Sequence, residues 1–393
     1  MVFIKSVNAK KIFDSRKEKT ILITIKTNVG VFSASSPNGK SKGKYEALPY
    51  KKDLDYDIFT IKKFKDYFSD ESIDCFDDLR RIEDIVDGHL GANTIFALES
   101  ATLKALAKEK KEEIWQLINE NYKNKNLKFP RLVGNCIGGG KHSKGKKPDF
   151  QEFLLIPKEN SIFESQKQNK KIKSLLYDNL KKIDRNFSGK KNDENAWMTS
   201  LNDKSVLDIL KEIVNNFKID LGIDCAASTF YKRKKYHYLN PSINRDKEEQ
   251  FNYISNLLRN YPIFYIEDPF DENDFVSFSR LLKKYPNRLI VGDDLTVTNL
   301  NRLKKALEMK SINAIIIKPN QNGFLSKVKE VCDLAKKNNI KIIFSHRSGE
   351  TEETILADLA FGFQADFLKS GISGKEREVK IKRLIEIEKK LKR

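Results

Sequence analysis

The second part of this 393-residue chain alternates short apolar runs with longer amphipathic segments, and this alternation limits the possible folds more than any other feature. The short runs are LGID, IFYIEDPF, RLIVGDD, NAIIIKPN, KIIFSHRSGE and ADFLKSG. The segments between them, such as FVSFSRLLKKY and NLNRLKKALEM, carry apolar residues at helical spacing. Because parallel strands need long crossover connections, this pattern predicts parallel strands covered by helices.

The first part of the chain has a different pattern. TILITIKTNVGVFSAS predicts two strands joined by a turn at residues 28–30, and NTIFALESATLKALAKEKKEEIWQLINE predicts a helical region. The polar stretch NYKNKNLKFP ends in Pro130 and marks a boundary. We therefore divide the chain into a mixed α and β domain over residues 1–126 and a second domain over residues 127–393.

The chain is strongly basic, with 74 Lys and Arg against 55 Asp and Glu and a formal net charge of +19. Such a balance can indicate a nucleic acid, an anionic membrane surface or acidic substrates as partners. The lysines are scattered among acids, and the 25 phenylalanines fall at core-like spacing instead of between basic residues. This distribution favours a lysine-coated surface, and we do not expect a nucleic-acid partner.

The four cysteines form no CxxC pair, so they predict small buried thiols in a reducing compartment. No apolar run approaches the length of a membrane span, and the N-terminus lacks the apolar core of a signal peptide. These features predict a cytoplasmic protein without membrane association.

Each short apolar run ends on polar, mostly charged residues. The series is Asp224, Glu267, Asp293, Lys318, His346 with Arg347, and Lys369. A single charged residue after a strand is usually a solvated loop residue. Six such endings in succession are different, because the C-terminal ends of all strands in a parallel barrel open on one face. We therefore expect these side chains to share one site.

The residue types in this series suggest acid–base chemistry at a metal ion. The three carboxylates are hard oxygen ligands that suit Mg²⁺, although salt bridges to Lys318 and Lys369 are the alternative. A lysine beside a divalent ion and a second lysine has its ammonium form disfavoured, so Lys318 could act as a base. The donors of His346, Arg347 and Ser348 suit an anionic group such as phosphate.

Longer strings resemble a known family. IEDPF, VGDDLTVTN, SHRSGETEET and KSG look like the barrel signatures of the enolases, and IFDSR, GKYEA, GANTIFALESATLKALA, DFQEFLLIP and IDCAASTFY agree in order. The resemblance spans residues 12–369. It implies a TIM-like (β/α)8 barrel with an N-terminal α+β capping domain. It also implies a lyase, phosphopyruvate hydratase, which reversibly dehydrates 2-phospho-D-glycerate to phosphoenolpyruvate in glycolysis and gluconeogenesis.

The resemblance further implies roles for individual residues. Lys318 resembles the base, Glu194 the acid and Glu152 its partner. The implied Mg²⁺ ligands are Asp224, Glu267 and Asp293 for a first ion, and Ser41 for a second, weaker ion. The implied substrate contacts are His142, Gln151, Glu152, Glu267, Asp293, Lys318, Ser345, His346, Arg347, Ser348 and Lys369. Members of the enolase superfamily use a Lys or His base with Mg²⁺ stabilising an ene-diolate. By family, a homodimer or higher oligomer is expected.

The sequence also departs from the family pattern. Asn192, Asn195 and Ala196 stand where the family has glycines around the acid, so we expect a differently shaped turn at Glu194. Lys40 and Lys42 flank Ser41 and add positive charge that should weaken the second metal site. Two alternatives stay open: an enolase paralogue with weak or altered activity, and a basic protein that binds nucleic acid or another partner on the same scaffold. The charged catalytic positions are kept, which favours the active enzyme.

Overall fold

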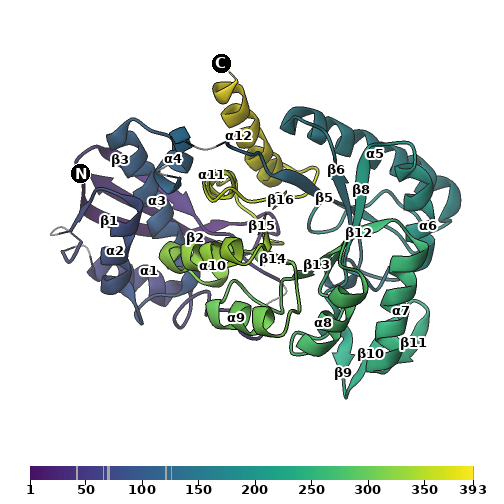
Figure 1. Ribbon diagram of the computed structural model, residues 1–393. Helices are drawn as coiled ribbons and strands as arrows, with labels where there is room; N and C mark the ends of the chain where they lie inside the picture. The colour runs from purple at the N-terminus through teal and green to yellow at the C-terminus, as the bar shows by residue number, and fades with distance from the viewer. Residues whose placement is uncertain (41–42, 65, 69–70, 120–121, 125, 393) are drawn as a thin grey trace.

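The computed structural model describes residues 1–393 except 41–42, 65, 69–70, 120–121, 125 and 393. Figure 1 shows two parts, a small sheet with helices near the N-terminus and a larger barrel formed by the rest of the chain. Within the described residues, no helix combines the length and the apolar composition that a membrane crossing requires.

The N-terminal part is built on an antiparallel sheet with strand order β3-β2-β1-β4. Its strands are β1 (Val2–Phe13), β2 (Lys19–Thr27), β3 (Gly30–Ser35) and β4 (Ser72–Ile73). The hairpin predicted about residues 28–30 is confirmed, since Thr27 pairs with Gly30 across the turn. Alternate residues of β2 are buried, and the sheet packs against α3 (Ala92–Lys110).

The remaining helices of this part are α1 (Leu54–Lys63), α2 (Leu79–Val86) and α4 (Ile114–Ile118). The sequence predicted one helical region from residue 93 onward, but the structure divides it into α3 and α4. Lys111 adopts a left-handed conformation with φ of 54° and ends α3. A lysine in this conformation is uncommon, and neither glycine nor proline marks the break in the sequence.

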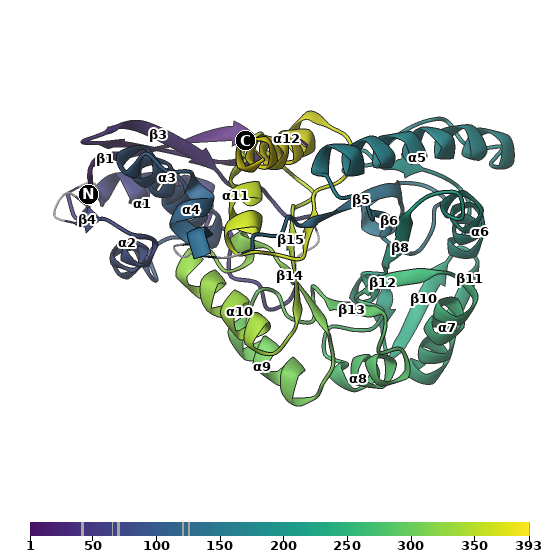
Figure 2. The same ribbon diagram turned by 45° about the horizontal axis from the view of Figure 1, so that its top comes forward.

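The barrel predicted for the second part is confirmed. Its strands are β5 (Arg131–Gly138), β6 (Glu152–Pro157), β8 (Ile219–Asp224), β12 (Ile263–Glu267), β13 (Leu289–Gly292), β14 (Ala314–Ile317), β15 (Lys341–Ser345) and β16 (Phe367–Lys369). Strand β16 pairs with β5, which closes the sheet into a barrel (Figure 2). Aliphatic and aromatic side chains fill its interior, so the barrel has a packed core.

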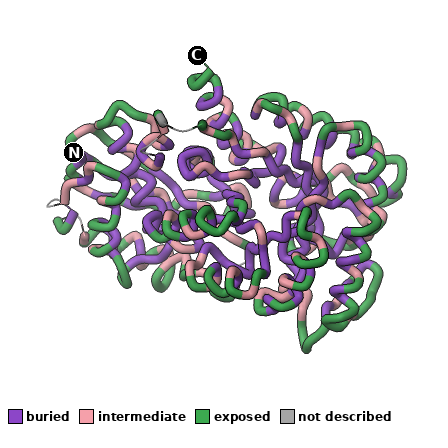
Figure 3. The backbone as a smooth tube through the Cα atoms, in the orientation of Figure 1, coloured by how far each residue is buried: buried purple, intermediate pink, exposed green. Residues whose placement is uncertain are grey.

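Helices surround the barrel and bury their apolar faces against it, as Figure 3 shows by the burial along the chain. They are α5 (Ile162–Ile183), α6 (Asp203–Val214), α7 (Lys247–Asn260), α8 (Phe275–Lys284), α9 (Leu300–Glu308), α10 (Leu325–Lys337), α11 (Ile355–Gly362) and α12 (Lys375–Leu391). Short strands β7 (Trp197–Met198), β9 (Tyr231–Lys232), β10 (Lys235–Leu239) and β11 (Ser242–Arg245) lie in the connections.

Strand β6 runs against its neighbours. The barrel strands from β8 onward are parallel, as the alternation predicted, but β6 pairs antiparallel with both β5 and β8. Its first residue, Glu152, therefore lies opposite Gly138 at the end of β5 and Asp224 at the end of β8. The reversed strand brings its first residue, instead of its last, to the end of the barrel where the other strands finish.

Candidate active site

A small cavity lies where these strands finish. The predicted site residues that line it are His142, Gln151, Glu152, Glu194, Asp224, Asp293, Lys318, Ser345, His346, Arg347, Ser348 and Lys369. Glu267 is fully buried and bonds to Lys369. Ser41 and Lys42 lie outside the described residues. The structure thus brings together side chains that are more than 200 positions apart in the chain, from His142 to Lys369.

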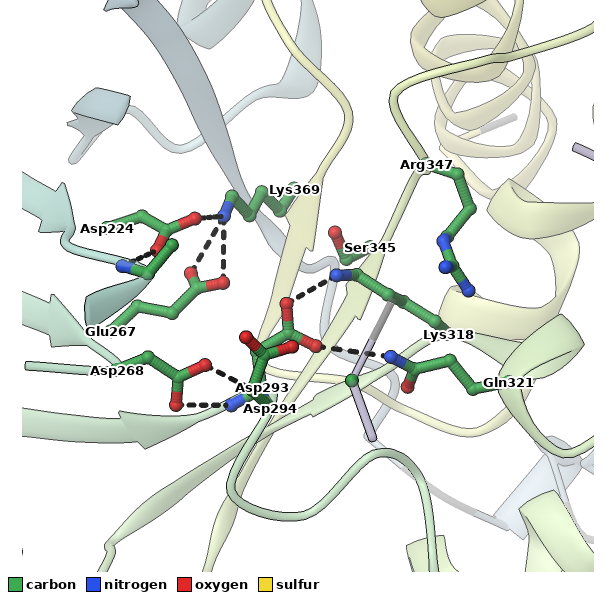
Figure 4. A network of polar contacts seen from close by, with 12 residues as sticks. Asp224, Glu267, Asp268, Asp293, Asp294, Lys318, Gln321, Ser345, Arg347 and Lys369 are labelled. Carbon is green, nitrogen blue, oxygen red and sulfur yellow. Dashed lines mark hydrogen bonds and ion pairs between the residues drawn. The ribbon is translucent and has the colours of Figure 1, made fainter. Parts of the chain in front are cut away.

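Lys369 lies at the centre of a cluster of carboxylates in the cavity (Figure 4). Its Nζ donates to Asp224 Oδ2 at 3.0 Å and to Glu267 Oε1 and Oε2 at 2.9 and 2.8 Å. Glu152 Oε2 lies 3.3 Å from the same atom. Burial acts to lower the pKa of Lys369, but the surrounding carboxylates raise it well above its usual value. The carboxylates around Lys369 therefore favour its protonated form.

Lys318 makes a separate ion pair with Asp293 Oδ2, and Gln321 Nε2 donates to Asp293 Oδ1 at 3.4 Å (Figure 4). Burial acts to lower the pKa of Lys318, but the Asp293 carboxylate raises it. We expected the ammonium form of Lys318 to be disfavoured beside a divalent ion. The ion pair with Asp293 does not test this expectation. The two lysines do form the salt bridges that the sequence analysis named as an alternative to a metal site.

Two further carboxylates, Asp268 and Asp294, line the cavity and were missed in the sequence analysis. Asp268 accepts hydrogen bonds from the backbone N–H of Asp293 at 3.1 Å and of Asp294 at 2.6 Å. Carboxylate oxygens of these three residues lie within 4.8 Å of one another. The doubled acids in IEDPF and VGDD were the available signal, because each second acid follows directly on a predicted ligand.

The donor set fits a divalent cation. Burial and then the charge of Asp224 raise the pKa of Glu267 to about 8, and burial with Asp293 raises that of Asp294 to about 8. Such crowding of buried carboxylates is relieved by a bound divalent ion, for which hard oxygen ligands are suited. An ion held by Asp224 and Glu267 would compete with the Lys369 ammonium for the same oxygens.

The other wall of the cavity holds Glu194 among nitrogen groups. Its Oε1 lies 3.4 Å from His142 Nδ1, and its Oε2 accepts from Asn135 Nδ2 at 3.0 Å and lies 3.9 Å from His346 Nε2. Burial acts to raise the pKa of Glu194, but His142, His346 and then Arg377 lower it well below its usual value.

Glu152 lies close to Glu194 and behaves in the opposite way. Their carboxylate oxygens and a ring nitrogen of His142 lie within 4.8 Å of one another. Burial and then the negative charge of Glu194 raise the pKa of Glu152 well above its usual value. Two carboxyl groups this close favour sharing one proton, because their negative charges repel each other.

Asparagines close the turn that carries Glu194. Asn192 Oδ1 accepts from the backbone N–H of Glu194 at 3.0 Å and of Ala196 at 2.9 Å. Asn195 adopts the left-handed conformation with φ of 62°, which asparagine tolerates better than most residues. Ala196 is not among the residues with positive φ. The turn therefore forms without glycine, because one asparagine bonds it internally and the other takes the strained backbone position.

Two cations from distant helices hold the same turn. Lys173 Nζ in α5 donates to the carbonyl oxygen of Asn195, and Arg377 in α12 donates to those of Asp193 at 3.1 Å and Glu194 at 3.4 Å. Three consecutive carbonyl groups thus face positive charge. The sequence analysis missed Lys173 and Arg377, because a charged residue in an amphipathic helix gives no signal of a buried role.

The N-terminal part covers the wall that holds Arg347. Arg347 Nη2 donates to Glu46 at 2.9 Å, and its Nη1 donates to Asn320 Oδ1 at 3.3 Å. A Cβ atom on Gly39 would lie 1.8 Å from Arg347 Nη2, so only glycine allows this close approach. Ser348 Oγ accepts from the backbone N–H of Lys40 at 2.9 Å. The polar loop of the N-terminal part therefore forms one side of the cavity.

The chain forms a closed eight-stranded barrel, and acids and lysines gather where its strands finish. A separate α and β part covers this site. The protein is therefore a TIM-barrel protein with a capping domain and with acidic and basic groups in its active site. A family model described as "Enolase, C-terminal TIM barrel domain" matches residues 126–393, and one described as "Enolase, N-terminal domain" matches residues 4–118. The chain belongs to the enolase family.

Curated relatives agree over nearly the full length. A protein named enolase from Pyrobaculum aerophilum is 34% identical over 96% of this chain and 94% of the relative. Enolases from Archaeoglobus fulgidus and Saccharolobus solfataricus are 34% and 35% identical, each over 98% of this chain and 97% and 96% of the relative. The resemblance inferred from the sequence motifs is confirmed at the level of the family.

Proposed function

We propose that the protein is a phosphopyruvate hydratase, a lyase that reversibly dehydrates 2-phospho-D-glycerate to phosphoenolpyruvate in glycolysis and gluconeogenesis. One observation carries this proposal: in a chain of the enolase family, Lys318, the Glu152–Glu194 pair and the carboxylates of the strand ends line or adjoin one buried cavity. The weak-paralogue and nucleic-acid alternatives are not favoured, since the relatives that cover nearly the whole chain are named enolase.

The reaction needs a base and an acid, and the two walls supply one each. Lys318 takes the proton from the carbon next to the substrate carboxylate. The leaving hydroxide takes a proton from the Glu152–Glu194 pair and departs as water, and the carbon–carbon double bond forms. Glu152 stores the proton, which its raised pKa favours, and Glu194 delivers it. After each turnover, Lys318 must lose its proton and the glutamate pair must regain one.

The cofactor we propose is Mg²⁺. Asp224, Glu267 and Asp293 would hold a first ion, and Ser41 would join a second, weaker one. When bound, the ions supply electrostatic stabilisation of the negative charge that builds up on the substrate carboxylate. Asp268 fixes the backbone before Asp293 and Asp294 and so orients the strand end that carries Asp293.

Cationic groups divide the contacts to the substrate. Lys369 binds the substrate carboxylate. Arg347 and Ser348, with Ser345 and His346 beside them, bind the phosphate, and the bidentate guanidinium fits a phosphate well. His142 and Gln151 complete the wall near the reacting hydroxyl. Since Glu46 pairs with Arg347, the phosphate must displace or share this carboxylate when it binds.

The family also suggests an oligomeric state, a location in the cell and a domain boundary. We expect a homodimer or a higher oligomer in the cytoplasm, and we place the domain boundary between residues 126 and 127. Sedimentation of the purified protein measures the oligomeric state, and limited proteolysis near Asn126 tests the boundary.

The proposed function is tested by following the ultraviolet absorbance of phosphoenolpyruvate after adding 2-phospho-D-glycerate and Mg²⁺. We expect turnover that stops when a chelator removes the metal and returns when Mg²⁺ is restored. A folded protein that shows no turnover with Mg²⁺ at any substrate concentration would contradict the assignment.

A further inference from the structure

A second cavity lies beside the active site and is lined mainly by polar and basic residues. It is open to solvent and shares His142 with the active-site cavity. Lys144 and Lys146 form one wall from the connection between β5 and β6, and Lys190 and Lys191 form the other, just before the turn of Glu194. We call this cavity the lysine cleft.

The lysine cleft carries unbalanced positive charge. Its four lysines are exposed, and among the residues that the structure describes they form no ion pair with an acid. Lys191 only lies over the Trp197 ring, at 5.0 Å from its centroid. Four positive charges therefore line the same open space, and the acid in this lining, Asp193, is paired with Lys40 at 2.5 Å.

Two further lysines lie near the cleft. Burial and then the positive charge of Lys40 lower the pKa of Lys147, which follows the Lys144 and Lys146 wall. Lys147 is held in place because its Nζ donates to the carbonyl oxygen of Ser143 at 2.6 Å. A small anion in the cleft would meet attraction from both walls and lie next to His142, at the side of the active site.

We propose that the lysine cleft binds small multiply charged anions and captures the phosphorylated carboxylate substrate on its way to the buried cavity. This inference rests on the proposed function. A lysine is a flexible point charge that attracts phosphate without imposing one geometry, which suits capture. Arg347 in the active site, in contrast, is buried and bonds to Glu46 and Asn320, which suits the final bound position. The two phosphate contacts therefore differ in rigidity as well as in place.

The test compares two charge-reversal pairs by steady-state kinetics with 2-phospho-D-glycerate. The first is Lys144→Glu with Lys146→Glu. The matched control is Lys336→Glu with Lys337→Glu, at the end of α10, which precedes β15 and so lies at the opposite end of the barrel. Both pairs change the formal charge by the same amount. Lys190→Glu alone examines the second wall without touching the Lys191 contact to Trp197.

At low ionic strength, about 0.01 M, kcat/KM should fall roughly tenfold in the cleft pair, because a basic cleft raises local substrate concentration and on-rate by at least this factor. It should fall by less in the Lys190→Glu variant, and the loss should shrink at about 0.15 M salt, where the Debye length is about 8 Å. The fall in kcat should be much smaller than that in kcat/KM. An equal loss in the cleft pair and the control pair would overturn the proposal.

A binding measurement keeps the outcome separate from that of the proposed function. Pyrophosphate is titrated into the wild type and both pairs in a calorimeter. Weaker binding in the cleft pair alone supports the anion site even if the wild type shows no turnover. Equal binding in all three proteins overturns it, whether or not the enzyme is active.

Discussion

The two walls of the active site hold their functional side chains by different means. Asp224, Glu267 and Lys369 are the last residues of β8, β12 and β16, so the hydrogen-bond ladder of the barrel fixes their backbone. Glu194 lies in a turn outside the barrel strands and depends on Lys173 and Arg377. A strand end is positioned by the fold itself, whereas a turn needs additional side chains that hold it.

One wall, which we call the strand-end wall, carries Asp224, Glu267, Lys318 and Lys369. The sequence predicted these residues because they recur at regular places in its pattern. Each apolar run ends on its functional residue, and a barrel brings such ends together. Asp268 and Asp294 escaped notice only because each follows directly on a residue already chosen. Glu152 required the resemblance, since β6 is antiparallel and presents its first residue at the mouth.

The other wall, which we call the turn wall, carries Glu194, and its structure could not be predicted in this way. Three glycine positions of the family pattern are occupied by other residues, which predicted a changed turn but not how it closes. The bonds of Asn192 are local to the turn, a role that asparagine commonly takes, whereas the donors from α5 and α12 arise from tertiary packing. Lys173 and Arg377 stand in helical segments that look like ordinary amphipathic surface, so local pattern carries no information about their partners.

The largest effect is expected on the strand-end wall. Lys318→Ala removes the proposed base, and kcat should fall by roughly 10³–10⁴-fold, near the upper range for loss of general base catalysis. The protein should still fold, but its melting temperature should fall, because the buried Asp293 carboxylate loses its partner. Loss of activity with a matching loss of folded protein, seen by circular dichroism, would mean that Lys318 is structural.

On the turn wall, Glu194→Gln should lower kcat by roughly 10²–10³-fold, since the amide cannot deliver a proton to the leaving hydroxyl. Glu152→Gln should lower it by a similar factor if the pair works as one acid. The double variant then loses little more than either single variant, because residues that act as a unit are not additive. Losses that multiply in the double variant would show that the two glutamates act independently.

Lys173→Met tests whether the turn needs its additional support. The change keeps the length of the side chain but removes its donor to the Asn195 carbonyl, and kcat should fall roughly tenfold, the equivalent of about 1.4 kcal/mol. KM should change less, because the contacts to the substrate on the strand-end wall remain. Lys173→Arg should restore most of kcat. A loss that arginine does not rescue would count against a positioning role.

The smallest effect is a pH dependence that arises from Lys173 on the turn wall. Burial lowers the pKa of Lys173 to about 8, from 10.5 for a free side chain, so the ammonium that supports Asn195 loses its proton as pH rises through about 8. We expect wild-type kcat to decline by about twofold more than that of Lys173→Arg between pH 7 and 9, since a neutral amine donates a weaker hydrogen bond.

The stability of the folded protein should change with pH in the opposite direction. Because the folded state binds fewer protons than the unfolded state between about pH 8 and 10.5, the free energy of unfolding of the wild type should rise with pH there, relative to Lys173→Met. Activity and urea unfolding measured over this range check both signs, and parallel curves for all three proteins would show that Lys173 does not support the turn through its charge.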